Sequence, residues 1–214
     1  MDNRKIFSFV DHTLLKPYAT WRQIERLAKE AEHYGAASVC IPPSYVKQVR
    51  SNFPELNITT VVGFPLGYSS TGTKIYEAFQ AVNSGANEID MVINICDVKN
   101  KKYNYIFEEI FQMKKNIGNN ILKVIVETCY LEKKEKIDLC DIVESSGADF
   151  IKTSTGFGDA GAQLDDIKLF KNHITNKLRI KAAGGIRTKE QMILFLEAGA
   201  DRLGCSTGIT ALFS

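Results

Sequence analysis

The sequence contains no long hydrophobic run and very little net charge. No apolar stretch approaches the roughly 18 residues that a membrane span requires, and the opening MDNRKIFSFV is interrupted by polar and charged residues before any signal-peptide core develops. The 27 basic and 25 acidic side chains leave a net charge of +2. A balance this close to neutral argues against a broad surface for nucleic acid or an anionic membrane. We therefore expect a soluble, cytoplasmic protein that acts on small molecules.

The chain also lacks the cysteine patterns that cross-link small proteins or bind metals. Its five cysteines are scattered and odd in number, and none lies in a CxxC or Cys/His ligand spacing. This pattern argues against a disulfide framework and against a zinc site, and it favours a reducing compartment. The segment GYSSTGTK at 67–74 superficially suggests a nucleotide-binding loop, but its lysine follows the threonine, so GxxxxGK[ST] is not satisfied.

Short apolar runs rich in β-branched residues recur along the chain, and each precedes a polar turn and a stretch with helical spacing. These runs lie at 9–15, 37–41, 58–62, 88–94, 122–128, 149–153, 179–183 and 201–205. The capping pattern T-x-x-Q opens predicted helices at 20–35 and 188–199, and each of them ends at a glycine. The sequence therefore predicts eight repeated βα units.

Eight βα units in one chain most economically form a (β/α)8 barrel, the TIM barrel. Strands that are apolar on both faces need helices outside them and packed side chains inside. An open, doubly wound sheet is the alternative, although no GxGxxG follows the first apolar run. Because no flexible linker or low-complexity tract interrupts the chain, we expect a single domain over residues 1–214.

Three charged residues, Asp90, Lys152 and Lys181, lie in or at the end of these apolar runs. In such a barrel the chemistry gathers where strands end and the following loops begin. Because side chains alternate along a strand, an Asp90 that points into the barrel leaves Ile89 and Met91 facing the helices. By the same rule Lys152 and Lys181 point inward from neighbouring strands, roughly 5 Å apart.

This pairing predicts a reactive amine. An ordinary lysine, with a pKa near ~10.4, is protonated at neutral pH and is a poor nucleophile. Burial and a neighbouring ammonium group both lower the pKa of a lysine, and a free amine forms an imine with an aldehyde or ketone. Asp90 can then transfer protons, directly or through water, while Lys181 stays charged. The residues indicate Schiff-base cleavage or formation of a carbon–carbon bond.

Other interpretations of these side chains stay open at this point. A single lysine near a strand end is usually a surface residue whose ammonium group reaches solvent, although two on successive strands beside an inward aspartate argue against it. Lys123 is either an inward charge that balances the carboxylates or a residue at the rim. Trp21, Tyr76 and Phe79 are expected to pack against other residues and not to contact a cofactor.

Two glycine-rich turns predict a phosphate site. AAGGIR at 182–187 and LGCSTG at 203–208 each lead into a helix, where exposed backbone N–H groups attract an anion. Ser206 and Thr207 offer hydroxyl donors, and Arg187 offers charge. The alternative is that these segments are tight turns without a ligand.

Seven segments, in order along the chain, resemble the signature segments of the deoxyribose-phosphate aldolase family. They are DHTLLKP (11–17), VVGFPLG (61–67), EIDMVIN (88–94), KVIVET (123–128), GADFIKTSTGF (147–157), KAAGGIRT (181–188) and GCSTG (204–208). The resemblance covers nearly the whole chain. It implies a class I aldolase that needs no metal or other cofactor and reversibly cleaves 2-deoxy-D-ribose 5-phosphate into acetaldehyde and D-glyceraldehyde 3-phosphate. It also favours a homodimer.

The resemblance assigns roles to individual residues as well. Lys152 matches the Schiff-base lysine, Lys181 the second catalytic lysine and Asp90 the proton-relay aspartate. Asp11 and Thr13 fall where the family contacts substrate hydroxyls, and we expect further substrate contacts from Lys123 and Thr155. The expected phosphate contacts are Gly156, Gly184, Gly185, Gly204, Ser206 and Thr207.

Two other functions are compatible with a barrel that has phosphate loops. A phosphosugar epimerase or isomerase would work through carboxylates or a metal, without an imine lysine. A non-catalytic phosphosugar-binding protein would keep the anion loops and tolerate Lys152→Ala without losing any reaction. The inward pair of Lys152 and Lys181 distinguishes the aldolase from the epimerase or isomerase, and the effect of Lys152→Ala distinguishes it from the binding protein.

Overall fold

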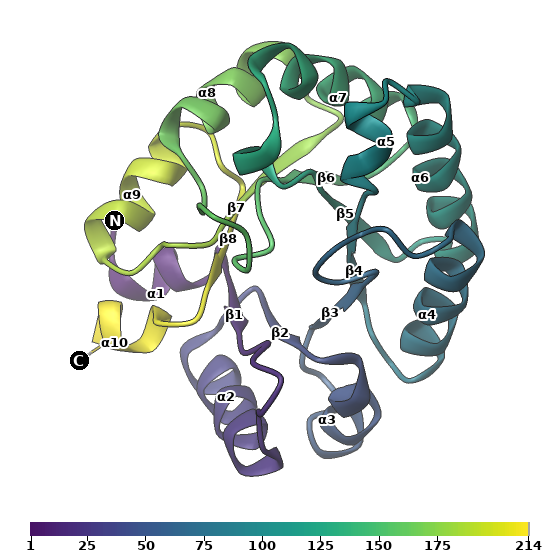
Figure 1. Cartoon of the computed structure of the whole chain (residues 1–214). Coiled ribbons are helices and arrows are strands. Elements are labelled where there is room, and N and C mark those ends of the chain that lie inside the picture. Colours follow the sequence, from purple (N-terminus) through teal and green to yellow (C-terminus); the bar gives the residue numbers. More distant parts are fainter. Residues whose placement is uncertain (214) are drawn as a thin grey trace.

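Eight parallel strands close into a barrel in the computed structural model, which describes residues 1–213 (Figure 1). The strands are β1 (Val10–Thr13), β2 (Ser38–Ile41), β3 (Ile58–Val62), β4 (Glu88–Val92), β5 (Ile121–Ile125), β6 (Phe150–Lys152), β7 (Arg179–Ala183) and β8 (Arg202–Cys205). Each strand pairs with the next in chain order, and β8 pairs with β1. The predicted (β/α)8 barrel is confirmed, and the alternative of an open sheet is wrong.

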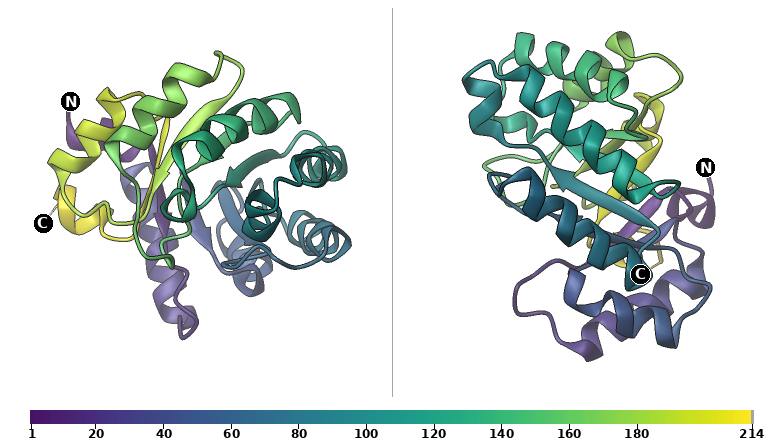
Figure 2. Two further views of the ribbon diagram at one scale, coloured as in Figure 1. Left: turned by 45° about the horizontal axis from the view of Figure 1, so that its top comes forward. Right: turned by 90° about the vertical axis from the view of Figure 1, so that its right-hand side faces the viewer.

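The helices lie outside the strands and surround them (Figure 2). They are α1 (Asn3–Phe7), α2 (Trp21–Tyr34), α3 (Val46–Asn52), α4 (Thr71–Asn83), α5 (Ile95–Lys99), α6 (Tyr103–Ile117), α7 (Lys133–Ser145), α8 (Leu164–His173), α9 (Lys189–Glu197) and α10 (Gly208–Phe213), with the short 3₁₀ helices η1 (Pro43–Tyr45) and η2 (Thr128–Tyr130). Over residues 1–213, none of them combines enough length with enough apolar character for a membrane crossing.

The helix boundaries follow the capping signals in the sequence. At the start of α2 the backbone N–H of Thr20 donates to Oε1 of Gln23 at 2.9 Å, and the helix ends at Gly35, whose φ of 75° is in the left-handed region. Thr188 and Gln191 form the same capping box at the start of α9. Local sequence therefore fixes where these helices begin and how the chain turns back toward the next strand.

Alternation along β4 separates two environments. Ile89, Met91 and Ile93 are buried in the apolar layer between the strands and the helices. Asp90 lies between them in sequence and points into the barrel, where its carboxylate accepts a hydrogen bond from Lys123 at 2.8 Å. The apolar core is thus mainly outside the barrel wall, and charged groups occupy part of the interior.

The aromatic residues of α4 lie on its outer face. Tyr76 and Phe79 are 64% and 53% exposed, so the expectation that they pack against other residues is wrong. The face of α4 that is buried against the barrel consists of Lys74, Ala78 and Ala81. Trp21 does pack, since its ring stacks on Tyr45 with centroids 6.5 Å apart.

Candidate active site

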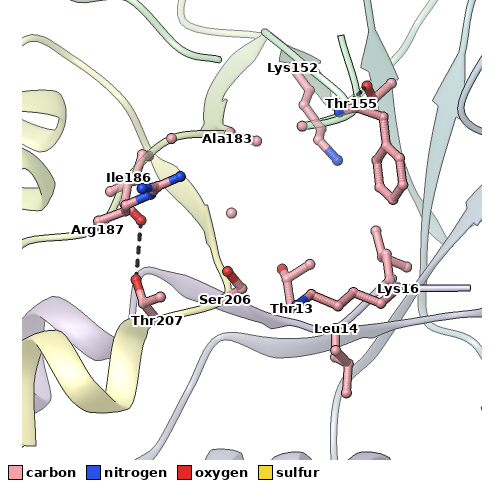
Figure 3. A pocket seen from close by; sticks show the side chains of 16 residues that line it. Thr13, Leu14, Lys16, Lys152, Thr155, Ala183, Ile186, Arg187, Ser206 and Thr207 are labelled. Carbon is pink, nitrogen blue, oxygen red and sulfur yellow. Dashed lines mark hydrogen bonds between the residues drawn. The ribbon is translucent and has the colours of Figure 1, made fainter. Parts of the chain in front are cut away.

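A cavity of about 620 Å³ opens at the C-terminal ends of the strands, among the loops that follow β1, β6, β7 and β8 (Figure 3). Its lining residues are Thr13, Leu14, Leu15, Lys16, Lys152, Thr155, Gly156, Phe157, Ala183, Gly184, Gly185, Ile186, Arg187, Gly204, Ser206 and Thr207. This is the end of a (β/α)8 barrel at which active sites are built. The cavity contains most of the residues that the sequence predicted for substrate and phosphate.

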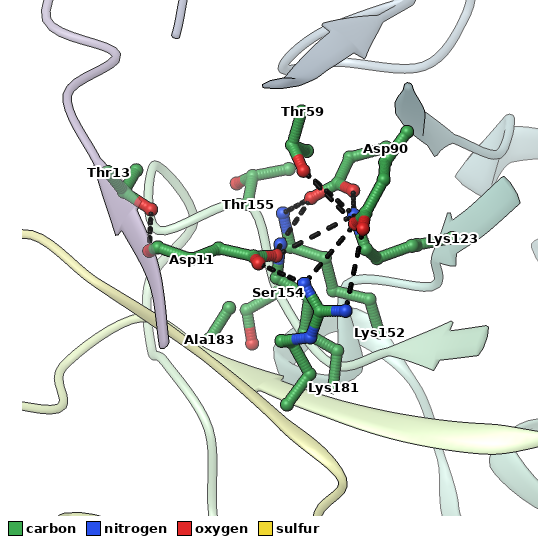
Figure 4. Close-up of polar contacts among 12 residues, drawn as sticks. Asp11, Thr13, Thr59, Asp90, Lys123, Lys152, Ser154, Thr155, Lys181 and Ala183 are labelled. Carbon is green, nitrogen blue, oxygen red and sulfur yellow. Dashed lines mark hydrogen bonds and ion pairs between the residues drawn. The ribbon is translucent and has the colours of Figure 1, made fainter. Parts of the chain in front are cut away.

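The three predicted catalytic residues lie together and contact one another (Figure 4). Lys152 and Lys181 are register partners on β6 and β7, as the alternation predicted. Their Nζ atoms each donate to the same oxygen, Oδ2 of Asp90, at 2.7 Å. Lys152 lines the cavity, whereas Lys181 and Asp90 lie beneath it.

The two lysines differ in their electrostatic surroundings. Burial lowers the pKa of Lys152; Asp90 opposes this effect and the Lys181 ammonium group adds to it. Burial also disfavours the charge of Lys181, but Asp11 and Asp90 outweigh it and raise the pKa of Lys181. The amine that faces the cavity is therefore the one that loses its proton more readily.

Asp90 stays ionised in spite of its burial. Burial alone would raise its pKa, but Lys123, Lys152 and Lys181 together hold that pKa well below its ordinary value. Its two oxygens are divided between these partners, because Oδ1 accepts from Lys123 at 2.8 Å and Oδ2 accepts from the other two lysines. An ionised carboxylate beside a free amine can accept and return protons.

Two predicted substrate contacts, Lys123 and Asp11, are not part of the cavity wall. Lys123 is fully buried and forms ion pairs with Asp90 at 2.8 Å and Glu88 at 2.5 Å, so it is an inward charge and not a rim residue. Asp11 is also fully buried and binds Lys181 and the hydroxyl of Ser38. Both contact predicted catalytic residues, Lys123 through Asp90 and Asp11 through Lys181, and neither lines the cavity.

Glu88 and Arg202 complete this buried network and were missed by the sequence reasoning. The guanidinium of Arg202 donates to Asp11 and lies 3.3 Å from Oε2 of Glu88. Alternation contained the signal for Glu88, since it is two residues before Asp90 and so faces the same side of β4. Arg202 is the register partner of Lys181 on β8, which no local pattern shows.

The predicted phosphate residues converge on one wall of the cavity. Gly156, Gly184 and Gly185 all have positive φ, between 76° and 85°. At Gly204 a Cβ atom would lie 2.9 Å from Cβ of Ala183 and 3.3 Å from Cε of Lys181, so a larger residue would displace the side chain of Lys181. Backbone turns of this kind expose N–H groups to an anion.

Two cationic side chains also line the cavity. Arg187, which the sequence proposed as a source of charge, lines the cavity. Lys16 lines it as well, from the loop after β1, and was not predicted. The sequence signal for Lys16 was its place in DHTLLKP, three residues after the end of β1. Thr13 and Thr155 line the cavity as expected.

No group of three or more His, Cys, Asp and Glu side chains within residues 1–213 has an arrangement that could hold a metal ion.

Comparisons with known proteins point in one direction. The family model described as "DeoC/LacD family aldolase" matches residues 5–211. The chain is 55% identical over 213 residues to the deoxyribose-phosphate aldolase of Clostridium botulinum (strain Eklund 17B / Type B), covering 99% of this chain and 96% of that protein. It is 53% identical over 205 residues to the deoxyribose-phosphate aldolase of Clostridioides difficile (strain 630), covering 95% and 94%.

The fold has a close counterpart among solved structures. The tetrameric deoxyribose phosphate aldolase from Aeropyrum pernix superposes with a TM-score of 0.92 at 28% identity, covering 99% of this chain and 91% of that one.

Proposed function

This chain belongs to the DeoC/LacD family of aldolases, and from that premise we propose that it cleaves 2-deoxy-D-ribose 5-phosphate reversibly through a Schiff base on Lys152. The products are D-glyceraldehyde 3-phosphate and acetaldehyde. One observation carries the proposal: the Lys152 amine faces the cavity and shares an oxygen of Asp90 with Lys181.

The proposed reaction begins with the neutral amine of Lys152. It attacks the aldehyde carbon C1 of the open-chain sugar, and loss of water leaves a protonated imine. A base then removes the proton of the C3 hydroxyl, the C2–C3 bond breaks, and its electron pair moves toward the imine to form an enamine. D-Glyceraldehyde 3-phosphate leaves. Protonation of C2 and hydrolysis of the imine then release acetaldehyde and the free amine.

Asp90 and Lys181 are proposed to hold the protons that these steps move. The pKa of Asp90 is well below its ordinary value, so it is present as the base. Asp11 and Asp90 raise the pKa of Lys181 although burial opposes this, so Lys181 remains a cation next to the amine of Lys152. General acid–base catalysis of this kind contributes roughly 10²–10⁴ in rate.

The substrate's phosphate is proposed to lie against the glycine turns. These turns line the cavity together with Ser206, Thr207 and the cations Lys16 and Arg187, and Figure 3 shows Arg187 and Lys16 on opposite sides of it. Backbone N–H groups and side-chain cations both favour a phosphate dianion. Recognition of the phosphate fixes which end of the sugar meets Lys152.

Trapping of the imine tests the proposal. Sodium borohydride added with 2-deoxyribose 5-phosphate or acetaldehyde reduces an imine to a stable secondary amine, which peptide mass spectrometry locates. The expected result is one adduct on Lys152. Lys152→Met should give no adduct, and Lys74→Met, which removes a different buried lysine, should leave the adduct unchanged. No adduct on any lysine of the folded protein would remove the aldolase mechanism in favour of the epimerase or isomerase.

We also propose that the protein is a homodimer in the cytoplasm and acts on small phosphosugars and aldehydes, without a nucleic acid or membrane partner. The dimer follows from the family resemblance, while the relative from Aeropyrum pernix is described as a tetramer. Light scattering on a size-exclusion column measures the mass directly. A mass of one or four chains at micromolar concentration would contradict the dimer.

A further inference from the structure

Glu127 has an unusual backbone conformation and does not line the cavity. It lies just after β5, and its φ of 52° and ψ of 67° place it in the left-handed region. A residue with a side chain adopts this region rarely, and such strain persists where surrounding structure demands it. Its side chain is 3% exposed. Something must hold this glutamate in place.

The carboxylate of Glu127 binds Thr155, the third residue of the loop after β6, which lines the cavity. It accepts the backbone N–H of Thr155 at 3.1 Å and also the Thr155 hydroxyl. The Thr155 hydroxyl oxygen in turn accepts the backbone N–H of Phe157 at 3.0 Å. One carboxylate thereby orders three consecutive residues, since both ends of the segment 155–157 depend on it.

This contact extends the pairing between β5 and β6 past the ends of the strands. The backbone N–H of Val126 donates to the carbonyl of Lys152 at 3.0 Å, and that of Thr128 donates to Thr153 at 2.9 Å. Glu127, between them, reaches farther along the chain to Thr155. Residues 126–128 therefore hold both the end of β6, which carries Lys152, and the segment 155–157, which lines the cavity.

The segment held by Glu127 packs closely against the glycine turn after β7. A Cβ atom on Gly184 would lie 3.4 Å from Cα of Gly156. Glu127 also lies under the next part of the loop, because a Cβ atom on Gly158 would be 3.2 Å from Cδ of Glu127. A small displacement of the segment would therefore change the spacing between the two halves of the anion-binding wall.

We propose that Glu127 is a positioning residue that sets the distance between the phosphate wall and the amine of Lys152. It does so by fixing Thr155, Gly156 and Phe157 against the turn at Gly184. This inference rests on the proposed function, because it assumes that the wall binds the phosphate of the substrate. It adds a residue that touches neither the substrate nor the reacting atoms.

The test compares a phosphorylated and an unphosphorylated substrate. For Glu127→Gln, kcat/KM is measured with 2-deoxyribose 5-phosphate and with 2-deoxyribose, and borohydride trapping is run with acetaldehyde. A glutamine has one acceptor oxygen where Glu127 has two, and its NH₂ group faces a donor. We expect the preference for the phosphorylated sugar to fall about tenfold or more, mostly through KM, since a hydrogen bond to a charged group is lost. The acetaldehyde adduct on Lys152 should form as in the wild type.

A matched control and a second variant keep the test decisive. Glu108→Gln removes an exposed carboxylate on α6 and should leave the preference unchanged. Glu127→Asp keeps the charge but shortens the side chain by one methylene, so its preference for the phosphorylated sugar should also fall. This variant replaces Glu127→Gln in the test if Glu127→Gln does not fold. A preference within twofold of the wild type in the folded variant would overturn the role of Glu127. Absence of turnover and adduct in the wild type would instead overturn the proposed function.

Discussion

Lys74 and Lys152 are both buried lysines with a lowered pKa, but their surroundings differ. Lys74 is fully buried on α4, where its Nζ donates to Glu109 at 2.9 Å and to the carbonyl of Val92 at 2.8 Å. Lys152 is 3% exposed, at the edge of a cavity. Burial is the largest cause of the lowered pKa at both lysines. A shifted pKa alone therefore does not identify a reactive amine.

Lys74 and Lys152 differ in the carboxylate that each contacts and in the free space around each amine. Glu109 contacts one lysine, and its burial raises its pKa. Asp90 contacts three lysines, which hold its pKa well below its ordinary value. Lys74 is enclosed, and its contacts with Glu109 and Val92 connect α4 to α6 and to the end of β4. Lys152, in contrast, lines the cavity. Chemistry requires a lowered pKa together with access and an ionised base.

The largest effect should be the difference in activity between Lys152→Met and Lys74→Met. Lys152→Met deletes the nucleophile, and we expect kcat to fall by at least about 10³ because every later step depends on the imine. Lys74→Met should retain activity within about tenfold, since no reacting atom is lost. Initial rates of D-glyceraldehyde 3-phosphate formation compare the two. Equal losses in both variants, with both folded by circular dichroism, would contradict the distinction.

The next effect separates Lys181 from Lys152. Lys181→Met removes a cation that lowers the pKa of Lys152 and frees Asp90 to pair with Lys152 more strongly. Both changes raise the pKa of Lys152, so the acid limb of the pH profile of kcat/KM should move to higher pH, and the rate at neutral pH should fall by about 10²–10³. An acid limb that moves to lower pH, or does not move, would show that Lys181 does not tune its neighbour.

Glu109→Gln should affect stability and not chemistry. It leaves the ammonium group of Lys74 buried without an anionic partner, which we expect to lower the free energy of unfolding by about 3 kcal/mol. The double variant Lys74→Met/Glu109→Leu removes both charges and should recover most of that loss. Urea titrations measure all three proteins. A double variant less stable than Glu109→Gln would mean that this buried pair is itself strongly stabilising.

The smallest effect is the pH dependence that Glu109 gives to the stability of the fold. Burial raises the pKa of Glu109, so the folded protein binds its proton more tightly than the unfolded chain does. Its contribution to stability is fully present below the unfolded pKa of about 4.3 and is lost as the pH rises through the folded pKa.

Lys74→Met should therefore gain stability relative to the double variant as the pH falls from about 7 toward about 4.5, because these two proteins differ only at residue 109. Lys74, whose lowered pKa acts in the opposite direction, is absent from both. Asp11 and Asp90, whose lowered pKa values weaken the fold in acid, are present in both proteins and cancel. Denaturant titrations across this range give the difference. A loss of stability relative to the double variant on acidification would contradict the raised pKa of Glu109.

The sequence predicted the parts of the site that depend on local pattern. The period of two along a strand was enough to place Asp90, Lys152 and Lys181 inside the barrel, and the glycine-rich turns line the cavity, where we propose that they bind phosphate. The depth of a buried side chain below the cavity could not be predicted from local pattern. How far below the cavity Lys123 and Asp11 lie depends on the stagger between strands, which no single segment encodes.

Helical faces were harder to predict where burial does not follow polarity. On α4 the lysine is buried and the aromatic residues Tyr76 and Phe79 are exposed. Lys74 lies in the segment that was set aside as a failed nucleotide-loop pattern, and nothing local pairs it with Glu109, 35 residues later. Its burial depends on tertiary packing between α4 and α6.

The buried network under the cavity has a consequence for electroneutrality. Three carboxylates, Asp11, Glu88 and Asp90, contact three cations, Lys123, Lys181 and Arg202. Burial raises the pKa of Cys40 to about 11, so its thiol adds no charge. This network is therefore electrically balanced while Lys152 is neutral, and the protonated imine that we propose would leave it one positive charge in excess. A phosphorylated sugar carries its own counter-ion into the same cavity, whereas acetaldehyde does not.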